Sequence, residues 1–438
     1  MSDVTADDAA DAAGDRTYYF ISDLHIGGDE ALRAVDFEAE LLSFLADLER
    51  TDEDAALIIN GDCFGLWEFT ELEGLAKFDA LVERYPELFA QLRRTGETVP
   101  ITVIPGNHDY ELAAYDEYVE RLAEYNVRLE QETAITRSVG EHTVWIEHGM
   151  QQDPNNRIPD FGNPFANPAG YFVNRHFTSK AGQLSERGKF NWLKDIQSVT
   201  PMEQIPEWLL SKYFYREMSP LLRYAAVPFL LLFNVSVLYL VVVLLAWTGI
   251  WPAPYRFIQA VIAELGLVGT VLDALLIANL AVVVLLSIVA APLYVYLWDV
   301  RRTLDRFGIV LGRGVGSGDA YLDRAREVFA AHPDVGAFVY GHTHRVSFSR
   351  VDGRAVINTG TWLKRLRRTP SRVGVLPPVF YPSFRLSYVR VTAEDGDLVI
   401  EYDEVEKADP ADLTLLERVV SVRPEPDAAL PDRVVIEG

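Results

Sequence analysis

Apolar residues occur in two spacings over the first third of the chain. Short continuous runs are typical of buried strands, and runs with a repeat near 3.6 residues are typical of helices packed on them. Strand-like runs occupy 18–22, 56–60, 101–104 and 143–147. Helix-like runs occupy 37–48, 78–92 and 115–125. This alternation predicts an α/β domain built in layers.

The same alternation returns in the last third of the chain. Residues 319–331 have helical spacing, and strand-like runs follow at 337–340, 355–358, 384–391 and 398–402. We therefore expect one α/β domain whose two halves are separated by a long insertion.

The insertion contains two long apolar runs. Residues 225–247 and 274–298 contain no charged side chain. Each exceeds the roughly 20 residues that cross about 30 Å of hydrocarbon. The alternative, a long buried helix of a soluble protein, explains two neighbouring runs less well. The sequence therefore predicts a transmembrane helical hairpin.

These patterns divide the chain into six predicted parts. They are a disordered acidic tail (1–16), the first half of the α/β domain (17–150), a juxtamembrane, lid-like insertion (151–224), the transmembrane hairpin (225–298), the second half of the α/β domain (299–404) and an acidic C-terminal tail (405–438).

Five short polar motifs follow predicted strands. They are Asp23-Leu24-His25, Gly61-Asp62, Gly106-Asn107-His108-Asp109, His148-Gly149 and Gly341-His342-Thr343-His344. Open α/β sheets bind ligands at the carboxyl ends of their strands. Carboxylate, amide and imidazole groups are ligands for manganese, iron and zinc. One such motif is weak evidence, but five in succession predict a metal centre.

With these motifs the chain resembles the calcineurin-like metallophosphoesterases, over 18–148 and 319–402. The resemblance implies a four-layer αββα sandwich, a pair of divalent metal ions and hydrolysis of a phosphoester or pyrophosphate bond by a bridging hydroxide. Manganese is the favoured metal, with iron and zinc as alternatives. The resemblance also implies the ligands: Asp23, His25, Asp62 and His344 for one ion, and Asp62, Asn107, His148 and His342 for the other. His108 would be the catalytic acid, oriented by Asp109.

Two segments also resemble the UDP-diacylglucosamine pyrophosphohydrolases and their relatives. These segments are FISDLHIGG at 20–28 and GDCFGLW at 61–67. Two positions depart from that pattern, because those enzymes usually have arginine in place of His108 and aspartate in place of Gly65. The resemblance implies a lipid-linked or nucleotide-linked substrate and leaves its identity open.

Charge narrows the set of partners. The chain has a net charge of −24, which disfavours a general nucleic-acid-binding role and weakens the alternative of a nuclease.

The second alternative, an inactive membrane sensor or anchor, is disfavoured because all the implied metal ligands are present. The acidic excess and the scarcity of lysine suggest a halophilic source. The single cysteine, Cys63, excludes an intrachain disulfide.

The basic residues indicate where the protein meets lipid. Lys364, Arg365, Arg367 and Arg368 form a basic run that we interpret as a site for a substrate diphosphate or anionic headgroups, with a solvated loop as the alternative. Arginines flank the two apolar runs on their outer sides, whereas the connection between the runs has only Arg256. The positive-inside rule then predicts a two-span protein of the cell membrane whose catalytic domain and termini are cytoplasmic. The expected partners are the bilayer and a phosphorylated small-molecule or lipid substrate, while the oligomeric state stays open.

Overall fold

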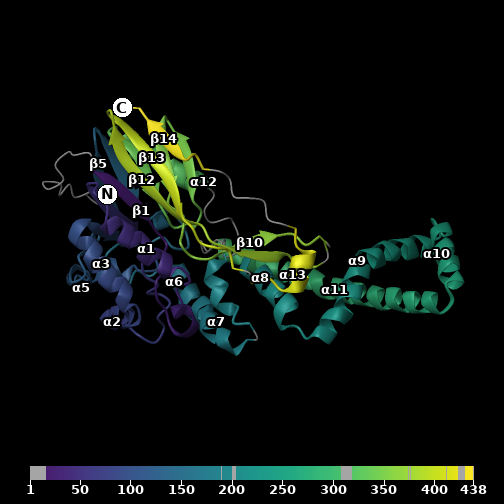
Figure 1. The fold of residues 1–438 in the computed structure, drawn as a ribbon. Coiled ribbons are helices and arrows are strands. Elements are labelled where there is room, and N and C mark those ends of the chain that lie inside the picture. The colour runs from purple at the N-terminus through teal and green to yellow at the C-terminus, as the bar shows by residue number, and fades with distance from the viewer. Residues whose placement is uncertain are drawn as a thin grey trace.

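The computed structural model describes residues 16–188, 190–199, 204–306, 318–372, 374, 376–410, 412–422 and 430–437. The predicted N-terminal tail, apart from Arg16, lies outside these residues. A layered α/β body carries a pair of long helices that project from one side (Figure 1).

The first sheet has seven strands in the order β14-β13-β12-β1-β2-β3-β4. The strands β1 to β4 run parallel, and β12 to β14 add antiparallel pairs at the other edge. Their bounds are β1 (Thr17–Ile21), β2 (Ala55–Asn60), β3 (Ile101–Ile104), β4 (Val127–Leu129), β12 (Leu386–Glu394), β13 (Asp397–Val405) and β14 (Arg433–Ile436).

The second sheet has five strands in the order β5-β6-β7-β9-β8. It joins the two halves of the sequence, because β6 from the first half pairs in parallel with β7 from the second. The bounds are β5 (Ala134–Val139), β6 (His142–Glu147), β7 (Val335–Tyr340), β8 (Ser347–Val351) and β9 (Arg354–Asn358).

Apolar side chains between the two sheets form the central core. Phe20 and Ile58 of the first sheet meet Ile146 and Val339 of the second. Helices α1 to α5 connect the parallel strands of the first sheet. Apolar residues of α1, α2, α3 and α5 pack on the face of this sheet that points away from the second sheet. The helix α12 packs on the second sheet. The bounds are α1 (Glu38–Glu49), α2 (Leu75–Arg84), α3 (Pro86–Thr98), α4 (Glu111–Ala114), α5 (Glu117–Ala123) and α12 (Gly318–Ala331), with a short turn η1 (Glu30–Arg33) before α1. The predicted α/β sandwich is therefore present.

Two predicted elements differ from the structure. The helix expected over 78–92 is two helices, α2 and α3, because Pro86 begins α3 and disfavours helical backbone at Tyr85. The segment after 404, expected as a tail, contributes α13 (Leu415–Val420) and the edge strand β14. Alternating burial of Val434 and Ile436 fits that strand to the sheet.

The insertion after β6 is a series of short helices and turns. They are η2 (Met150–Gln152), α6 (Ala169–Val173), η3 (Asn174–Thr178), α7 (Ser179–Gln183), η4 (Leu184–Arg187), η5 (Leu193–Ser198), α8 (Ile205–Lys212) and η7 (Tyr213–Glu217). Residues from η5 and α8 pack on the hairpin formed by β10 (Arg365–Thr369) and β11 (Val379–Ser383). This hairpin belongs to the second half of the sequence, so the insertion is bound to both halves.

The aromatic residues of the insertion divide into two groups. Trp192 and Trp208 are buried against Leu366 and Phe380, so they are core residues. Phe172, Phe177, Phe190 and Tyr213 are exposed.

The projecting part consists of α9 (Pro220–Trp247), α10 (Ala253–Glu264) and α11 (Gly266–Arg306). The helices α9 and α11 lie side by side, and α10 closes the far end (Figure 1). Among the described residues, one stretch, Gly266–Thr303, is long and apolar enough to cross a membrane, while the apolar stretch Val235–Trp247 in α9 is shorter. The predicted two-span hairpin is therefore not confirmed as a whole.

The packing of the insertion gives a first prediction. Replacing Trp208 by Ala should lower the free energy of unfolding by about 3–5 kcal/mol, because a large buried side chain leaves a cavity. The matched control is Tyr213→Ala, since Trp208 is 0% exposed and Tyr213 is 49% exposed. Thermal unfolding of the full-length protein in one detergent measures both. Equal melting temperatures for the two variants would contradict this packing.

Candidate metal centre

The polar motifs meet where strands of the two sheets end. Asp23 and His25 follow β1, Asp62 follows β2, and Asn107 and His108 follow β3. His148 follows β6 of the second sheet, and His342 and His344 follow β7. The carboxyl ends of these parallel strands point to one region, so residues more than 300 positions apart become neighbours.

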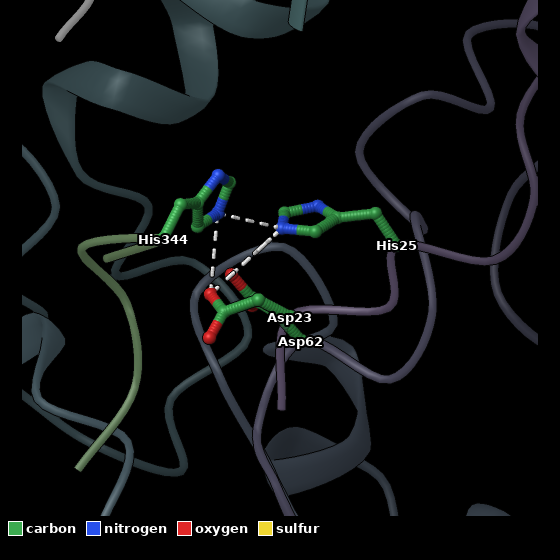
Figure 2. A group of neighbouring side chains, drawn as sticks. All are labelled: Asp23, His25, Asp62 and His344. Atoms are coloured by element: carbon green, nitrogen blue, oxygen red, sulfur yellow. Dashed lines mark hydrogen bonds and ion pairs between the residues drawn. The ribbon is translucent and has the colours of Figure 1, made fainter. Parts of the chain in front are cut away.

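A first group joins Asp23, His25, Asp62 and His344 (Figure 2). The Nε2 atoms of His25 and His344 lie 3.1 Å apart. His344 Nε2 is 3.2 Å from Asp23 Oδ1, and His25 Nε2 is 3.5 Å from Asp62 Oδ2. These are the four residues expected at the first metal position, and their ligand atoms converge on one point.

A second group joins Asp62, His148 and His342. His148 Nε2 lies 3.2 Å from Asp62 Oδ2 and 3.3 Å from Asn107 Oδ1. His148 Nδ1 contacts the carbonyl oxygen of Asn60 at 2.9 Å, which directs Nε2 toward the centre. Asp62 belongs to both groups, as expected for a shared ligand.

The carboxylates fit a cation. Asp23 is fully buried, and its Oδ2 accepts hydrogen bonds from Ser22 Oγ and the His342 backbone N–H. Its Oδ1 accepts no hydrogen bond from the described residues, and its neighbours are the Nε2 atoms of His344 at 3.2 Å and His25 at 4.0 Å. A buried carboxylate oxygen without a hydrogen bond is costly. This oxygen faces the first group, where a divalent ion would satisfy it.

The charge state of the histidines supports the same conclusion. Burial alone would lower the pKa of His148, but the adjacent Asp62 carboxylate outweighs burial and raises that pKa to about 10. Burial and the neighbouring His108 lower the pKa of His25 to about 3. In the protein alone, a histidine proton balances the buried carboxylates, and a metal ion can replace it.

The backbone at the site adopts a rare conformation. Ten non-glycine residues of the described chain have positive φ, and five of them belong to the two groups. The five are Asp23, His25, Asp62, His342 and His344, with φ between 45° and 66°. Such conformations cost free energy and concentrate at functional sites.

Glycines next to the site permit close approach. A Cβ atom at Gly106 would lie 2.2 Å from Asp62 Oδ1, and one at Gly61 would lie 2.3 Å from His148 Nδ1. A Cβ atom at Gly341 would lie 2.6 Å from Asp23 Oδ2. The glycine in each of these motifs therefore leaves room for the side chain of a different motif.

His108 lies beside the first group and is held by an unexpected residue. Its Nδ1 is 2.8 Å from Glu68 Oε1, and its ring packs on Trp67 with centroids 4.5 Å apart. Burial opposes protonation, but the Glu68 charge outweighs it and raises the pKa of His108 to about 9.

The expectation that Asp109 orients His108 is wrong. The Asp109 oxygens accept backbone hydrogen bonds from Gly106, at 2.6 Å, and Phe64, at 3.2 Å. Burial and the nearby Asp62 charge raise the pKa of Asp109 to about 7. Asp109 therefore shapes the loop, while Glu68 contacts the histidine ring.

Glu68 fills the space next to Gly65. A Cβ atom at Gly65 would lie 2.9 Å from Glu68 Oε2, so the absence of a side chain at 65 makes room for the carboxylate. The departure from the pyrophosphohydrolase pattern at Gly65 was the sequence signal for this arrangement. Those enzymes usually have an aspartate at that position, and here Glu68 provides a carboxylate nearby.

The insertion reaches this part of the site. Asn174 Nδ2 and Gln197 Nε2 donate to Glu68 Oε1 at 3.2 and 2.8 Å. Tyr171 packs edge-on against Trp67. Side chains of the insertion therefore help to hold the His108–Glu68 pair.

Asp153 is the second residue that the motifs did not predict. Its Oδ2 lies 3.0 Å from His342 Nε2, and its Oδ1 accepts the backbone N–H of Asn155. It is buried at the start of the insertion, five residues after His148. Asp153 sits where it can orient His342 toward the second group.

The basic run has two kinds of position. Lys364 is buried in ion pairs with Asp195, at 2.6 Å, and Asp36, at 3.3 Å. Arg368 forms a two-point pair with Glu207 of α8, at 2.5 and 2.8 Å. These ion pairs join Lys364 and Arg368 to the insertion, and their contact with substrate stays a prediction. Arg365 and Arg367 line a cavity of about 580 Å³ that extends to His344.

The glycine contacts give a second prediction. Gly106→Ala should displace the Asp62 carboxylate and weaken divalent-metal binding at least tenfold, because the added methyl overlaps it. Isothermal titration with Mn²⁺ measures this in the full-length protein. The control is Gly374→Ala, where a Cβ atom would meet nothing within 4 Å. Unchanged metal affinity in Gly106→Ala would contradict the assignment.

Comparisons with known proteins agree with this site. The family model of calcineurin-like phosphoesterases matches residues 16–228. No curated protein matches the chain.

Several solved structures are similar to the chain at low identity. Vps29 from Entamoeba histolytica, complexed with Zn²⁺, is 9% identical, with 89% of this chain and 92% of that chain covered and a TM-score of 0.26. Phosphopantetheinyl hydrolase from Mycobacterium tuberculosis is 13% identical, with coverage of 80% and 91% and a TM-score of 0.26. A protein described as a 5'-nucleotidase from Staphylococcus aureus, in complex with alpha-ketoglutarate, is 12% identical, with coverage of 92% and 57% and a TM-score of 0.30.

The assignment rests on the family model together with the motifs that the fold assembles. Over residues 16–228 the chain matches the calcineurin-like phosphoesterases, and it is a hydrolase of phosphoester bonds.

Proposed function

We propose that the protein is a membrane-anchored phosphoesterase that uses two divalent metal ions to cleave a phosphoester or pyrophosphate bond in a lipid-linked or nucleotide-linked substrate. The observation that carries the proposal is the pair of ligand groups that share Asp62. Asp23, His25, Asp62 and His344 would hold one ion. Asp62, Asn107, His148 and His342 would hold the other, and manganese suits this mixed oxygen and nitrogen set, with iron or zinc as alternatives.

When bound, a pair of divalent ions would activate a water molecule and neutralise charge on the phosphoryl oxygens. The chain's own residues provide the rest of the chemistry. His108 can donate a proton to the leaving oxygen, since it borders the first group through His25, with ring centroids 4.4 Å apart. Glu68 contacts Nδ1, so Nε2 is the ring nitrogen that exchanges a proton with the substrate.

The helix α11 supports membrane anchoring. At about 1.5 Å per residue its 41 residues extend about 60 Å, twice the roughly 30 Å of hydrocarbon in a bilayer. Only 17% of its most apolar stretch is buried, unlike the core helix of a soluble protein. Exposed aromatic residues lie near both ends of the projecting pair, as at membrane interfaces: Tyr294, Tyr296 and Trp298 near the body, and Trp247 and Trp251 near the tip.

The tip is fixed by polar contacts as well as apolar packing. Gln259 of α10 donates to the hydroxyl of Tyr239 in α9 at 2.8 Å and approaches Asp273 of α11 at 3.5 Å. Tyr239 and Leu276 also pack against Ile262 of α10. The three helices therefore form one small bundle, which supports a hairpin in which α9 is the second span.

The arginines near the body favour a cytoplasmic catalytic domain. Arg301, Arg302 and Arg306 are exposed at the end of α11, and Arg256 lies at the tip. Arg216, which precedes α9, is buried in ion pairs with Asp412 and Glu417, so it contributes to packing rather than to orientation. The positive-inside rule then rests on the exposed arginines of α11.

Replacing Asp62 tests the metal pair. Asp62→Ala should remove the shared ligand and abolish both metal binding and hydrolysis, whereas His108→Ala should retain metal and lower kcat roughly 10²–10⁴-fold. The loss in His108→Ala should be larger for phenyl phosphate than for p-nitrophenyl phosphate, whose leaving group needs less protonation. Metal analysis and steady-state kinetics measure both effects, with the exposed Asp47→Ala as the control. Full activity of Asp62→Ala would refute the proposal.

Cysteine labelling tests the topology. Cys63 is buried, so single cysteines introduced at Pro254 and Arg302 can be compared in the full-length protein. We expect an impermeant maleimide to label position 254 in intact cells, and position 302 only after permeabilisation. The reverse pattern, or labelling of both positions in intact cells, would exclude this orientation.

A further inference from the structure

A basic cavity adjoins the first ligand group. Its volume is about 580 Å³, and its lining includes His344. Six cationic side chains and no acidic one appear among the described residues that line it, in a chain with a net charge of −24. The six are Arg345, Lys364, Arg365, Arg367, Arg368 and Arg385. This concentration of positive charge indicates an anionic ligand.

The carboxylates that balance some of these cations lie outside the lining. Lys364 pairs with Asp195, Arg368 with Glu207, and Arg385 with Glu404. Each of these pairs uses the cation to bind parts of the fold together. They leave the cavity itself without a negative side chain among its described lining residues.

Arg345 differs from these three residues. It is exposed, and no ion pair joins it to another residue in the described part of the chain. It directly follows His344, so their Cα atoms are about 3.8 Å apart. Because His344 and Arg345 both line this cavity, an anionic group bound in it by Arg345 would share the cavity with a phosphoryl group held at the first ligand group.

The remaining lining suits the organic part of such a ligand. Val346, Phe348, Leu366 and Leu430 contribute apolar surface to the same cavity. A cavity of this size and mixed character is typical of small-molecule sites, in which a few charged groups fix the orientation of the ligand.

We infer that Arg345 and this cavity bind a second anionic group of the substrate, next to the phosphoryl group that is hydrolysed. The preferred substrate class is then a diphosphate or a doubly phosphorylated compound rather than a simple monoester. This inference rests on the proposed function, because it takes the two ligand groups as the place of hydrolysis. It assigns to Arg345 a role in specificity, with Arg365 and Arg367 lining the same cavity.

Two probes that both carry a terminal phosphonate group test the inference. Adenosine 5'-(α,β-methylene)diphosphate carries two adjacent anionic groups and resists hydrolysis between them, whereas phenylphosphonate carries one. Binding of each is measured by calorimetry on the metal-loaded, full-length protein in an uncharged detergent. Arg345→Gln should weaken binding of adenosine 5'-(α,β-methylene)diphosphate (the diphosphonate-type probe) about tenfold, as expected for a lost charge-assisted hydrogen bond. It should leave the affinity for phenylphosphonate unchanged. Arg345→Lys should restore part of the loss.

Arg326→Gln is the matched control, since Arg326 is an exposed arginine of α12 paired with Asp323 and does not line the cavity. Micelles containing phosphatidylglycerol distinguish the source of the anion. If these micelles displace the diphosphonate-type probe from the wild-type protein but not from Arg345→Gln, the anion is a lipid headgroup. If they do not displace the probe, the anion belongs to a soluble compound. Either result supports an anion site at Arg345. Equal weakening of both probes, or of neither, overturns it. If the metal-loaded wild-type protein does not bind phenylphosphonate at all, that result would instead count against the proposed metal centre.

Discussion

The structure depends on two carboxylates, Asp23 and Asp62, which are buried where the strands of both sheets end. Burying a charge is unfavourable unless it is compensated. Compensation comes from His148 beside Asp62 and from His344 beside Asp23, which follow β6 and β7, and these two strands belong to different halves of the sequence. The pairing of β6 with β7 is therefore what assembles the site, and the metal ions would complete the compensation.

The insertion is also held in place by contacts between distant parts of the sequence. It leaves the body after β6, covers the His108–Glu68 pair with Asn174 and Gln197, and returns through α11 to the strand that carries His342 and His344. The ion pair of Asp195 with Lys364 fastens it to the hairpin of β10 and β11. The proposed membrane anchor and the candidate metal centre are thus connected through the insertion, which is the physical reason for proposing a substrate that is presented at the bilayer.

The sequence predicted those features of the site that are local in the chain. Each metal-ligand motif follows a short apolar run, so its position at a strand end could be read from spacing. The roles of Glu68 and Asp153 could not, because their meaning depends on contacts with His108 and His342 that only the folded chain creates. Asp109 was misassigned for the same reason, since adjacency to His108 in sequence suggested a contact that the loop does not make.

The aromatic and basic segments show a second limit. Trp192 and Trp208 lie in a segment rich in aromatic and basic residues but are core residues, because β10 and β11 cover them from a distant part of the chain. The strand β14 was missed because its apolar run is short and gains its place only by pairing with β13. Burial by a remote element leaves no signal in local periodicity, so such elements require the three-dimensional structure.

The central claim is that two metal ions share Asp62. Electron paramagnetic resonance of the full-length protein, titrated with Mn²⁺, tests it most directly, because ions that share a carboxylate ligand are close enough for their spins to couple. The account predicts a spin-coupled spectrum as the site fills to two ions per chain. A spectrum of isolated Mn²⁺ ions at saturation, or saturation at one ion per chain, would contradict it.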